Sequence, residues 1–212
     1  MTDYRKEKYW SKFADNFNEE QTYIVGEAVQ QVILERLSGE SDLGELVELG
    51  CGAGFYTKVL AENANNVMAT DLSDEMLAVA RTQLKECQNV IIEKTDCEKT
   101  AFPDGKFDSV FMANLVHIIE NPSIVLHESY RILKDGGLIF IIDYTGYGMK
   151  RFEMMKMGIR FIVKWGKPLS YFRSRLSPDE LRSLVEGVGF KVEEVELMGD
   201  KAKALFLKGR KG

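Results

Sequence analysis

Apolar and polar residues alternate along this chain with two different periods. Short apolar runs bounded by turn residues predict strands, and apolar spacings of three to four residues predict helices between them. The predicted strands cover 45–49, 66–70, 90–94, 107–113 and 138–142. The helices between them cover 56–62, 73–87 and 122–133. Strands that alternate with helices in this way favour a parallel sheet with helices on both faces.

The N-terminal part of the chain departs from this alternation. Tyr9, Phe13 and Phe17 recur every fourth residue and predict one helix, and the apolar pattern predicts a second helix over 22–37. We therefore expect residues 1–40 to form a helical cap on the sheet domain.

The C-terminal part also departs from it. Residues 147–176 interrupt the pattern after the fifth strand and predict a helical insertion, and Ser177 and Pro178 then begin another helix. Two further strands, 191–197 and 202–208, are predicted to pair as an antiparallel hairpin. The whole chain, 1–212, is thus predicted to be a single α/β domain. Its fold would be Rossmann-like: a doubly wound, seven-stranded, mostly parallel sheet with an antiparallel C-terminal hairpin.

Composition places the chain among ordinary globular proteins. Apolar residues make up 45% and charged residues 29% of the 212. No apolar run is long enough to span a bilayer, and the first residues lack the apolar core of a signal peptide. Three cysteines and two histidines show no disulfide or metal-ligand spacing. We therefore expect a cytoplasmic protein with no bound metal.

Charge is distributed unevenly along the chain. The net charge is −5, but the segment from Lys150 to Arg175 carries eight basic residues and one acid, Glu153. A patch of this kind commonly contacts a partner or substrate. No aromatic base-stacking motif follows the fourth strand, and we expect no nucleic-acid partner.

A glycine-rich turn is the most informative motif. Gly50, Gly52 and Gly54 stand at alternate positions between the first strand and the helix after it, with Glu48 just before them. In doubly wound sheets, an adenosine-containing cofactor binds at this turn. Dinucleotides require the spacing G-x-G-x-x-G, which is absent here, and a pyrophosphate would be poorly placed beside Glu48. A phosphate-free adenosine cofactor with a cationic amino-acid tail, S-adenosylmethionine, suits this turn. Cys51 is interpreted as a small turn residue.

The ends of the next three strands carry matching polar groups. Asp71 ends the second strand and can accept hydrogen bonds from two ribose hydroxyls. Asp96 and Cys97 follow the third strand, where a carboxylate and a backbone N–H can recognise adenine. Asn114 follows the fourth strand. Leu72 and Met76 are predicted to form the apolar walls of a purine slot.

These motifs together resemble the class I S-adenosylmethionine-dependent methyltransferases. The matching segments are VELGCGAGFYT, ATDLSDEML, TDCEKTAFPDGKFDSVFMANLVHII and YRILKDGGLIFIIDY, which cover about 45–145. The phrases AFPDGKFDSV and RILKDGG are most similar to the small-molecule branch, which includes the ubiquinone- and menaquinone-biosynthesis methyltransferases.

The resemblance implies in-line transfer of a methyl group to a small acceptor, with S-adenosylhomocysteine as the product. It implies that Glu48 and the three glycines hold the methionine part, that Asp71 holds the ribose, and that Asp96 with Cys97 holds the adenine. The family commonly has a tyrosine near Phe17 in a helix that closes over the cofactor, so a hydroxyl is missing here.

His117 is the best-placed candidate for a general base. It lies three residues after Asn114, and it could remove a proton from a hydroxyl acceptor. The alternative interpretation is a structural histidine that bonds to a neighbouring loop. Acceptors that react through carbon, nitrogen, oxygen or sulfur all fit the scaffold.

The insertion has two compatible interpretations. Within 149–167, basic residues recur at helical spacing beside a broad apolar face that ends near Trp165. This pattern favours contact with a membrane surface or with an amphipathic, isoprenoid or lipid-like acceptor. It fits equally well a lid helix whose apolar face covers the active site. Two other functions are alternatives for the whole protein: an NAD-dependent oxidoreductase, and a non-catalytic partner protein that binds S-adenosylmethionine.

Overall fold

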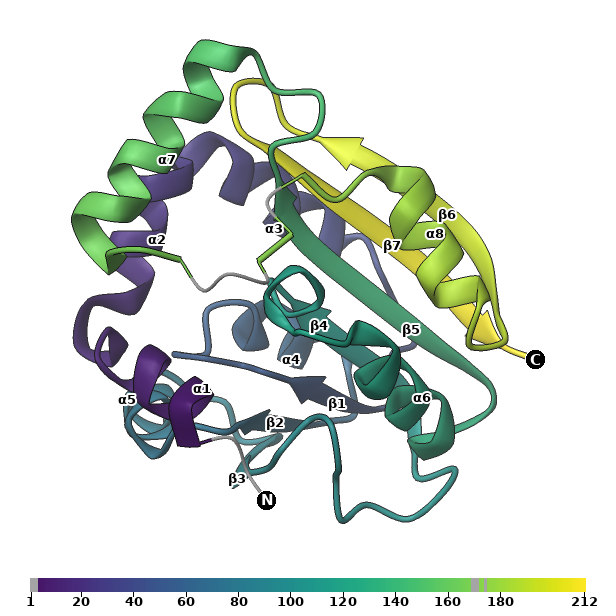
Figure 1. Ribbon diagram of the computed structural model, residues 1–212. Helices are drawn as coiled ribbons and strands as arrows, with labels where there is room; N and C mark the ends of the chain where they lie inside the picture. The colour runs from purple at the N-terminus through teal and green to yellow at the C-terminus, as the bar shows by residue number, and fades with distance from the viewer. Residues whose placement is uncertain (1–3, 169–171, 174) are drawn as a thin grey trace.

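Seven strands form one sheet in the order β3-β2-β1-β4-β5-β7-β6 (Figure 1). The computed structural model describes residues 4–168, 172–173 and 175–212. Strand β7 runs antiparallel to β5 and β6, and the other pairs are parallel. The predicted mostly parallel sheet with a terminal hairpin is therefore confirmed. The strands are β1 Glu45–Leu49, β2 Asn66–Asp71, β3 Val90–Lys94, β4 Phe107–Ala113, β5 Leu133–Thr145, β6 Phe190–Met198 and β7 Lys203–Lys211.

Helices cover both faces of this sheet. One face is covered by α3, α4 and α5, and the other by α6 and α8 (Figure 1). The helices are α1 Tyr4–Ser11, α2 Phe17–Val25, α3 Glu27–Ser38, α4 Thr57–Asn63, α5 Asp74–Gln83, α6 Pro122–Ile132, α7 Arg151–Trp165 and α8 Pro178–Glu186. Short 3-10 turns lie at Ala14–Asn16 and Val116–Ile118.

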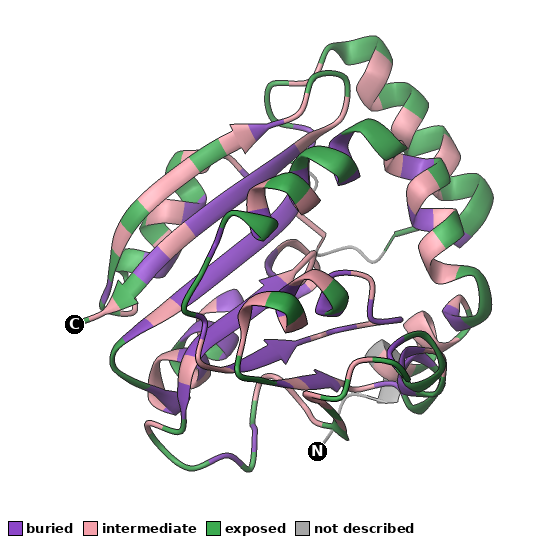
Figure 2. Ribbon diagram, turned by 180° about the vertical axis from the view of Figure 1, so that it is seen from behind, coloured by how far each residue is buried: buried purple, intermediate pink, exposed green. Residues whose placement is uncertain are grey.

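The middle strands are buried on both faces because their side chains alternate between two apolar layers. In β1, Val47 and Leu49 pack into the layer under α6 and α8, while Leu46 packs into the layer under α3 and α4. Figure 2 shows these strands as the buried centre of the molecule. Parallel pairing brings the carboxyl ends of β1, β2 and β4 to one edge, together with the end of β5. Open α/β sheets bind ligands at this edge.

The N-terminal helices are shorter than the sequence predicts. The prediction of a single helix through Phe17 was wrong, because α1 ends at Ser11 and α2 begins only at Phe17. The predicted helix over 22–37 is divided at Gly26, whose φ of 91° lies in the left-handed region and stops α2. As a result α3 packs on the sheet, whereas α2 leaves it and packs against α7.

The predicted turn before the strongest strand is a bulge within β5. Pairing with β4 jumps from Phe107–Leu133 to Ser109–Leu138, and Gly136 adopts a φ of 75° within the four residues of β5 that lie opposite Asp108 alone. The helix predicted to begin at Ser177 is confirmed. The Ser177 Oγ accepts from the Glu180 N–H at 3.2 Å, and a Glu180 carboxylate oxygen accepts from the Ser177 N–H at 2.8 Å.

The predicted insertion contains α7, which lies beyond the carboxyl edge of the sheet (Figure 1). The Trp165 indole N–H donates to a Glu20 carboxylate oxygen of α2 at 2.9 Å and fixes the two helices together. Residues 169–171 and 174 of the predicted insertion, and 1–3 of the predicted cap, lie outside the described residues. The division into a cap over 1–40 and an insertion over 147–176 stays a prediction.

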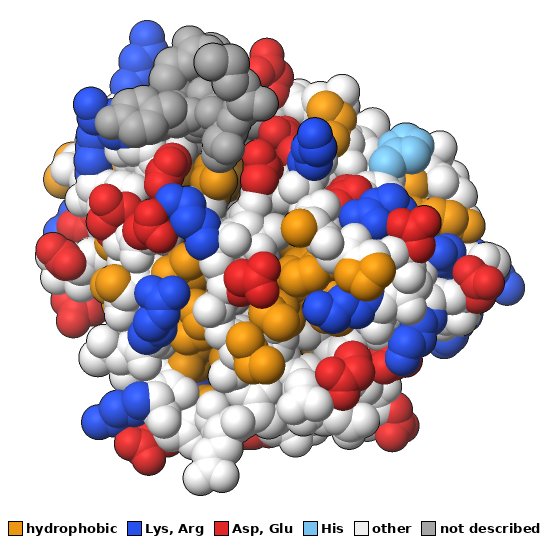
Figure 3. Space-filling view, turned by 90° about the horizontal axis from the view of Figure 1, so that it is seen from below, with side chains coloured by type: hydrophobic (Ala, Val, Ile, Leu, Met, Phe, Trp, Pro, Cys, Tyr) orange, Lys and Arg blue, Asp and Glu red, His pale blue; other side chains and the backbone are white. Residues whose placement is uncertain are grey.

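One edge of the sheet is thinly covered. Residues 95–106, between β3 and β4, form no helix, and Ile91 of β3 is 58% exposed. Figure 3, which views the molecule from below, shows hydrophobic side chains gathered on this side between charged ones. No helix among the described residues has the length and apolar content needed to cross a membrane.

Candidate functional site

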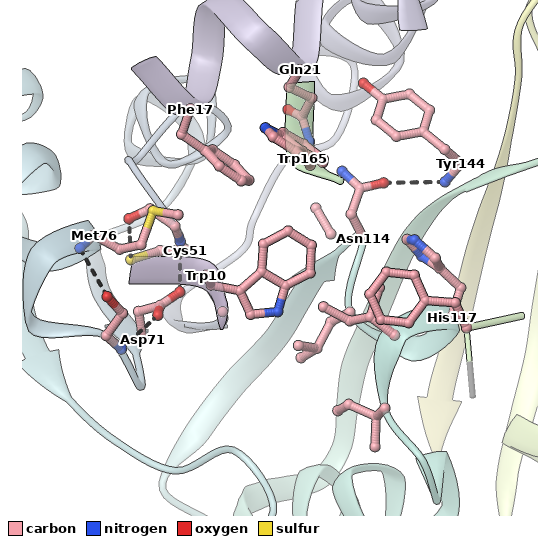
Figure 4. Close-up of a pocket in the computed structure, with 18 of the residues that line it drawn as sticks. Trp10, Phe17, Gln21, Cys51, Asp71, Met76, Asn114, His117, Tyr144 and Trp165 are labelled. Atoms are coloured by element: carbon pink, nitrogen blue, oxygen red, sulfur yellow. Dashed lines mark hydrogen bonds between the residues drawn. The ribbon is translucent and has the colours of Figure 1, made fainter. Parts of the chain in front are cut away.

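A cavity of about 620 Å³ opens at the carboxyl edge of the sheet under a roof formed by α1, α2 and α7. Its volume lies in the range of small-molecule sites. The site residues expected from sequence gather in its lining, with one exception, Gly54 (Figure 4). Those that line it are Glu48, Gly50, Cys51, Gly52, Asp71, Leu72, Met76, Asp96, Cys97, Asn114 and His117.

The glycine turn presents backbone to this cavity. Gly50 and Gly52 have φ values of 77° and 52°, which residues with a Cβ rarely adopt. The N–H groups of Gly50 and Cys51 both donate to the Thr70 carbonyl at 2.8 Å and hold the turn against β2. A Cβ at Gly54 would lie 2.8 Å from the Leu84 side chain. Packing against the segment after α5 therefore requires a glycine at position 54. Contact between Gly54 and a cofactor stays a prediction.

Asp71 connects the glycine turn to the start of α5. One carboxylate oxygen accepts from the Gly52 N–H at 2.9 Å, and the other accepts from the Ser73 N–H at 2.9 Å. Burial raises the pKa of Asp71, although these backbone hydrogen bonds act in the opposite direction. Each carboxylate oxygen has two lone pairs, so Asp71 retains acceptor sites on the side that faces the cavity.

Glu48 is a buried carboxylate in the wall of the cavity. It is 1% exposed, and the Thr57 hydroxyl donates to it at 2.6 Å. Burial raises the pKa of Glu48 to about 7; the Thr57 hydrogen bond lowers it, and the nearby charge of Asp71 raises it further. No lysine or arginine among the described residues forms a salt bridge with Glu48. A buried acid without a protein cation fits a ligand that supplies an ammonium group.

The loops after β3 and β4 complete the lower wall. The Asp96 carboxylate accepts from the Glu98 N–H at 3.0 Å, which turns the loop so that Asp96 and Cys97 face the cavity. Asn114 has a φ of 56°, a conformation that asparagine tolerates better than most residues. Its side-chain oxygen accepts from the Tyr144 N–H at 3.1 Å and ties the end of β4 to β5.

His117 makes a contact that the sequence did not predict. Its Nδ1 lies 2.7 Å from a carboxylate oxygen of Asp143, which is on β5 and fully buried. The other Asp143 oxygen has no hydrogen-bond partner among the described residues. Asp143 follows an apolar run, and no sequence motif distinguishes it. Its hydrogen bond to His117 is what identifies it as part of the site.

An aromatic roof closes the cavity from above. Phe17 stacks on Trp165 with ring centroids 5.3 Å apart, and Trp10 stacks on Phe172 at 6.1 Å. In Figure 4 the Trp10 ring lies between Asp71 on one side and Asn114 and His117 on the other. Phe17 lies 3.4 Å from the position of a Cβ at Gly52. It therefore covers the glycine turn by ring contact and without the hydroxyl that the family commonly has.

The half of the cavity near His117 is mainly apolar. Its walls come from α2, the end of β5 and α7. Of these walls, only the segment that contains α7 is predicted from the sequence to contact an acceptor. Polar groups elsewhere in the lining include Gln21 and the hydroxyls of Tyr56 and Tyr144, which lie 3.0 Å apart. The apolar walls include Ile24, Val25, Ile118, Ile119, Met157 and Phe161. No three metal-ligating side chains group together among the described residues.

Comparison with known proteins finds similarity to one family over part of the chain. Residues 47–141 match the family model described as a methyltransferase domain. The chain is 29% identical over 156 residues to a ubiquinone biosynthesis O-methyltransferase of Dinoroseobacter shibae, over 73% of this chain and 62% of that protein. It is 33% identical over 121 residues to a malonyl-[acyl-carrier protein] O-methyltransferase of Serratia marcescens, over 56% of this chain and 46% of that protein. The chain thus spans between about half and three fifths of these relatives.

The fold agrees with solved structures. A SAM-dependent methyltransferase from Aquifex aeolicus superposes with a TM-score of 0.70 at 21% identity, over 94% of this chain and 97% of that one. This likeness extends the agreement beyond the matched domain to the fold of nearly the whole chain.

Proposed function

We propose that the chain carries a class I S-adenosylmethionine-dependent methyltransferase domain and that the protein methylates a small lipophilic acceptor. When bound, S-adenosylmethionine supplies a methyl group that is already activated on a sulfonium sulfur. The protein must hold the acceptor in line with that group and exclude water, and positioning alone accounts for about 7–11 kcal/mol of such a barrier.

The residues at the strand ends fit this cofactor. Glu48 is buried and has no cationic partner in the part of the chain that the structure describes, so it suits an ammonium group of a ligand. Gly50 and Gly52 have no side chains and leave the backbone beside it accessible to that ligand. Asp71 retains lone pairs for ribose hydroxyls, and Asp96 faces the same cavity from the next loop. We assign the methionine part to the glycine turn, the ribose to Asp71 and the adenine to the loop that contains Asp96 and Cys97.

The single observation that carries the proposal is that this cofactor wall continues into an apolar chamber. The apolar residues of α2 and α7 line the same cavity as the cofactor wall, and so does His117. Its apolar walls favour an acceptor with a large apolar surface, because burial of that surface stabilises the complex by about 25 cal/mol per Å². We propose that His117 removes the proton that the acceptor loses.

We also propose that the acceptor is isoprenoid or lipid-like and that residues 149–167 contact a membrane surface. The outer side of α7 exposes Phe152, Met155, Ile159 and Val163 by 55–68%. Single exposed apolar residues are ordinary, but four along one side of a helix are typical of an interaction surface. Basic residues flank them and favour an anionic bilayer.

The apolar chamber and this outer surface are continuous. Gly158 and Ile162, one turn apart on α7, both line the cavity, and both are exposed to solvent beside the outer apolar residues. No described heavy atom lies within 4 Å of the position of a Cβ at Gly158. A long apolar chain could leave the chamber at this point, which supports a membrane-bound acceptor.

The test is transfer of labelled methyl groups from S-adenosylmethionine into a cell extract, with lipid and aqueous fractions counted separately. We expect label in the lipid fraction. Label confined to the aqueous fraction would contradict the lipophilic acceptor, and no label in either fraction, with purified protein that binds S-adenosylhomocysteine, would contradict the activity itself.

A further inference from the structure

Asp143 is a buried charge that no part of the cofactor site uses. It is 0% exposed on strand β5, and the only hydrogen bond described for its side chain is to His117. An isolated buried carboxylate is costly unless it is paired. The cost is tolerated where the carboxylate fixes a functional group, and here the group that it touches faces the acceptor chamber.

The hydrogen bond fixes the tautomer of His117. A carboxylate can only accept, so the Nδ1 of His117 carries the proton in the 2.7 Å bond to Asp143. In the neutral imidazole the other nitrogen, Nε2, is then an acceptor. His117 is therefore prepared to take a proton at Nε2.

The turn that carries His117 is held from two further directions. The Arg173 N–H donates to the His117 carbonyl at 2.8 Å, and the Arg173 guanidinium donates to the Glu120 carbonyl at 2.9 Å. The Phe172 ring packs against the imidazole edge to face, with centroids 6.2 Å apart. These contacts fix the backbone and the ring plane of His117. The hydrogen bond to Asp143 then determines which imidazole nitrogen carries the proton.

We propose that Asp143 is the positioning residue for His117 and that the acceptor of the proposed methyl transfer carries a hydroxyl group. In this step the acceptor O–H bond breaks and the proton goes to Nε2 of His117. The electron pair on oxygen forms the new bond to the methyl carbon while the carbon–sulfur bond breaks and S-adenosylhomocysteine leaves. The Asp143 carboxylate then stabilises the imidazolium that forms. An acceptor without an ionisable proton has no use for this pair, so the pair selects among the acceptor classes that fit the scaffold. The inference rests on the proposed function.

The tautomer can be measured without knowing the acceptor. The chain has only two histidines, so a long-range proton–nitrogen NMR spectrum of ¹⁵N-labelled protein shows two imidazoles, and His127→Gln assigns them. His127 lies on α6, where its Nδ1 bonds to the Ser123 carbonyl, outside the cavity. We expect His117 in the Nδ1–H form in the wild type and a shift toward the Nε2–H form in Asp143→Asn. A wild-type His117 in the Nε2–H form would overturn the proposal, even if Asp143→Asn failed to fold.

Activity supplies the second arm. Asp143→Asn and His117→Gln should each lower methyl transfer into the lipid fraction by about a hundredfold or more, whereas His127→Gln should not. Affinity for S-adenosylhomocysteine should stay unchanged in all three variants, which separates loss of the base from loss of the cofactor site. Full activity in Asp143→Asn would overturn the positioning role.

The hydroxyl is tested on the extract itself. Acetylation of the lipid fraction should abolish incorporation, and hydroxylamine, which removes acetyl groups from oxygen but not from nitrogen, should restore it. Incorporation that survives acetylation, or that hydroxylamine does not restore, would overturn the hydroxyl acceptor. If the wild type binds no S-adenosylhomocysteine, the proposed function fails, whatever tautomer His117 adopts.

Discussion

At the scale of single residues, charge and burial explain most of the site. Glu48 is the sharpest case, because its carboxylate is fully buried and its pKa is raised to about 7. Below this pH Glu48 is neutral in the free protein, and above it Glu48 is charged. A ligand with an ammonium group prefers the charged form, so it must displace a proton when it binds at lower pH.

We therefore expect the affinity for S-adenosylhomocysteine to fall as pH decreases through 7. Because each pH unit below the pKa lowers the charged fraction tenfold, binding at pH 6 should be about tenfold weaker than at pH 8. Methylthioadenosine, which lacks the amino-acid tail, is the control and should bind equally at both values. Calorimetry that finds the same pH dependence for both ligands would remove Glu48 from the ammonium site.

Asp71 gives a second prediction at this scale. Asp71→Ala removes the proposed acceptor for the ribose hydroxyls, together with the bonds that hold Gly52 and Ser73. We expect affinity for S-adenosylhomocysteine to weaken by about 1–3 kcal/mol, the usual cost of an unpaired buried polar group. Asp74→Ala is a suitable control, because Asp74 lies three residues away with its side chain 68% exposed. Equal affinity of the Asp71 variant and the wild type would count against the ribose role.

At the scale of elements, the sheet was predictable and the roof was not. The strands at 45–49, 66–70, 90–94 and 107–113 follow from local apolar runs, because burial on both faces leaves a pattern that neighbouring residues share. The division at Gly26 lets α2 leave the sheet and pack against α7, a segment more than a hundred residues away. The apolar periodicity of residues 22–37 does not indicate that α2 packs against a helix so far away in the sequence.

The same distinction separates the predicted site residues from the missed ones. Glu48, Asp71 and Asn114 stand next to strand ends, so the strand pattern indicates where they lie. Asp143 also follows a predicted strand, 138–142, but only its pairing with His117 shows what its side chain does.

Gly158 provides the prediction for α7. Glycine inside a helix is less favourable than alanine by about 0.8–1.0 kcal/mol, and no described atom would meet a new Cβ at this position. Gly158→Ala should therefore raise the melting temperature, measured by circular dichroism. Gly26→Ala is the contrasting variant: its φ of 91° strains any other residue, and its melting temperature should fall. A lower melting temperature for Gly158→Ala would show that its Cβ lacks the space inferred here.

At the scale of the whole molecule, the cavity and the outer surface of α7 form one path from the cofactor wall to the exterior. The basic residues on α7 lie on a protein of net charge −5, so their attraction to an anionic surface is local. Lys164 is paired with Glu20 of α2, and the Arg160 guanidinium lies over the Tyr23 ring, whereas Arg151 and Lys156 are exposed.

We expect the protein to float with vesicles of phosphatidylcholine and phosphatidylglycerol at low salt. Each basic residue near such a surface contributes about 1 kcal/mol, so Arg151→Glu with Lys156→Glu should weaken binding by about thirtyfold or more. Lys85→Glu with Lys191→Glu makes the same charge change in the turn after α5 and on β6, away from α7, and should have little effect. A wild type that stays with the aqueous fraction would contradict the membrane contact.

The proposed methyltransferase function depends most directly on which adenosine-containing ligand the cavity accepts. Calorimetric titration of the wild type with S-adenosylhomocysteine and, separately, with NADH decides this. We expect saturable one-site binding of S-adenosylhomocysteine and no heat from NADH, because Glu48 repels a pyrophosphate and pairs with an ammonium group. Binding of NADH without binding of S-adenosylhomocysteine would contradict the methyltransferase function.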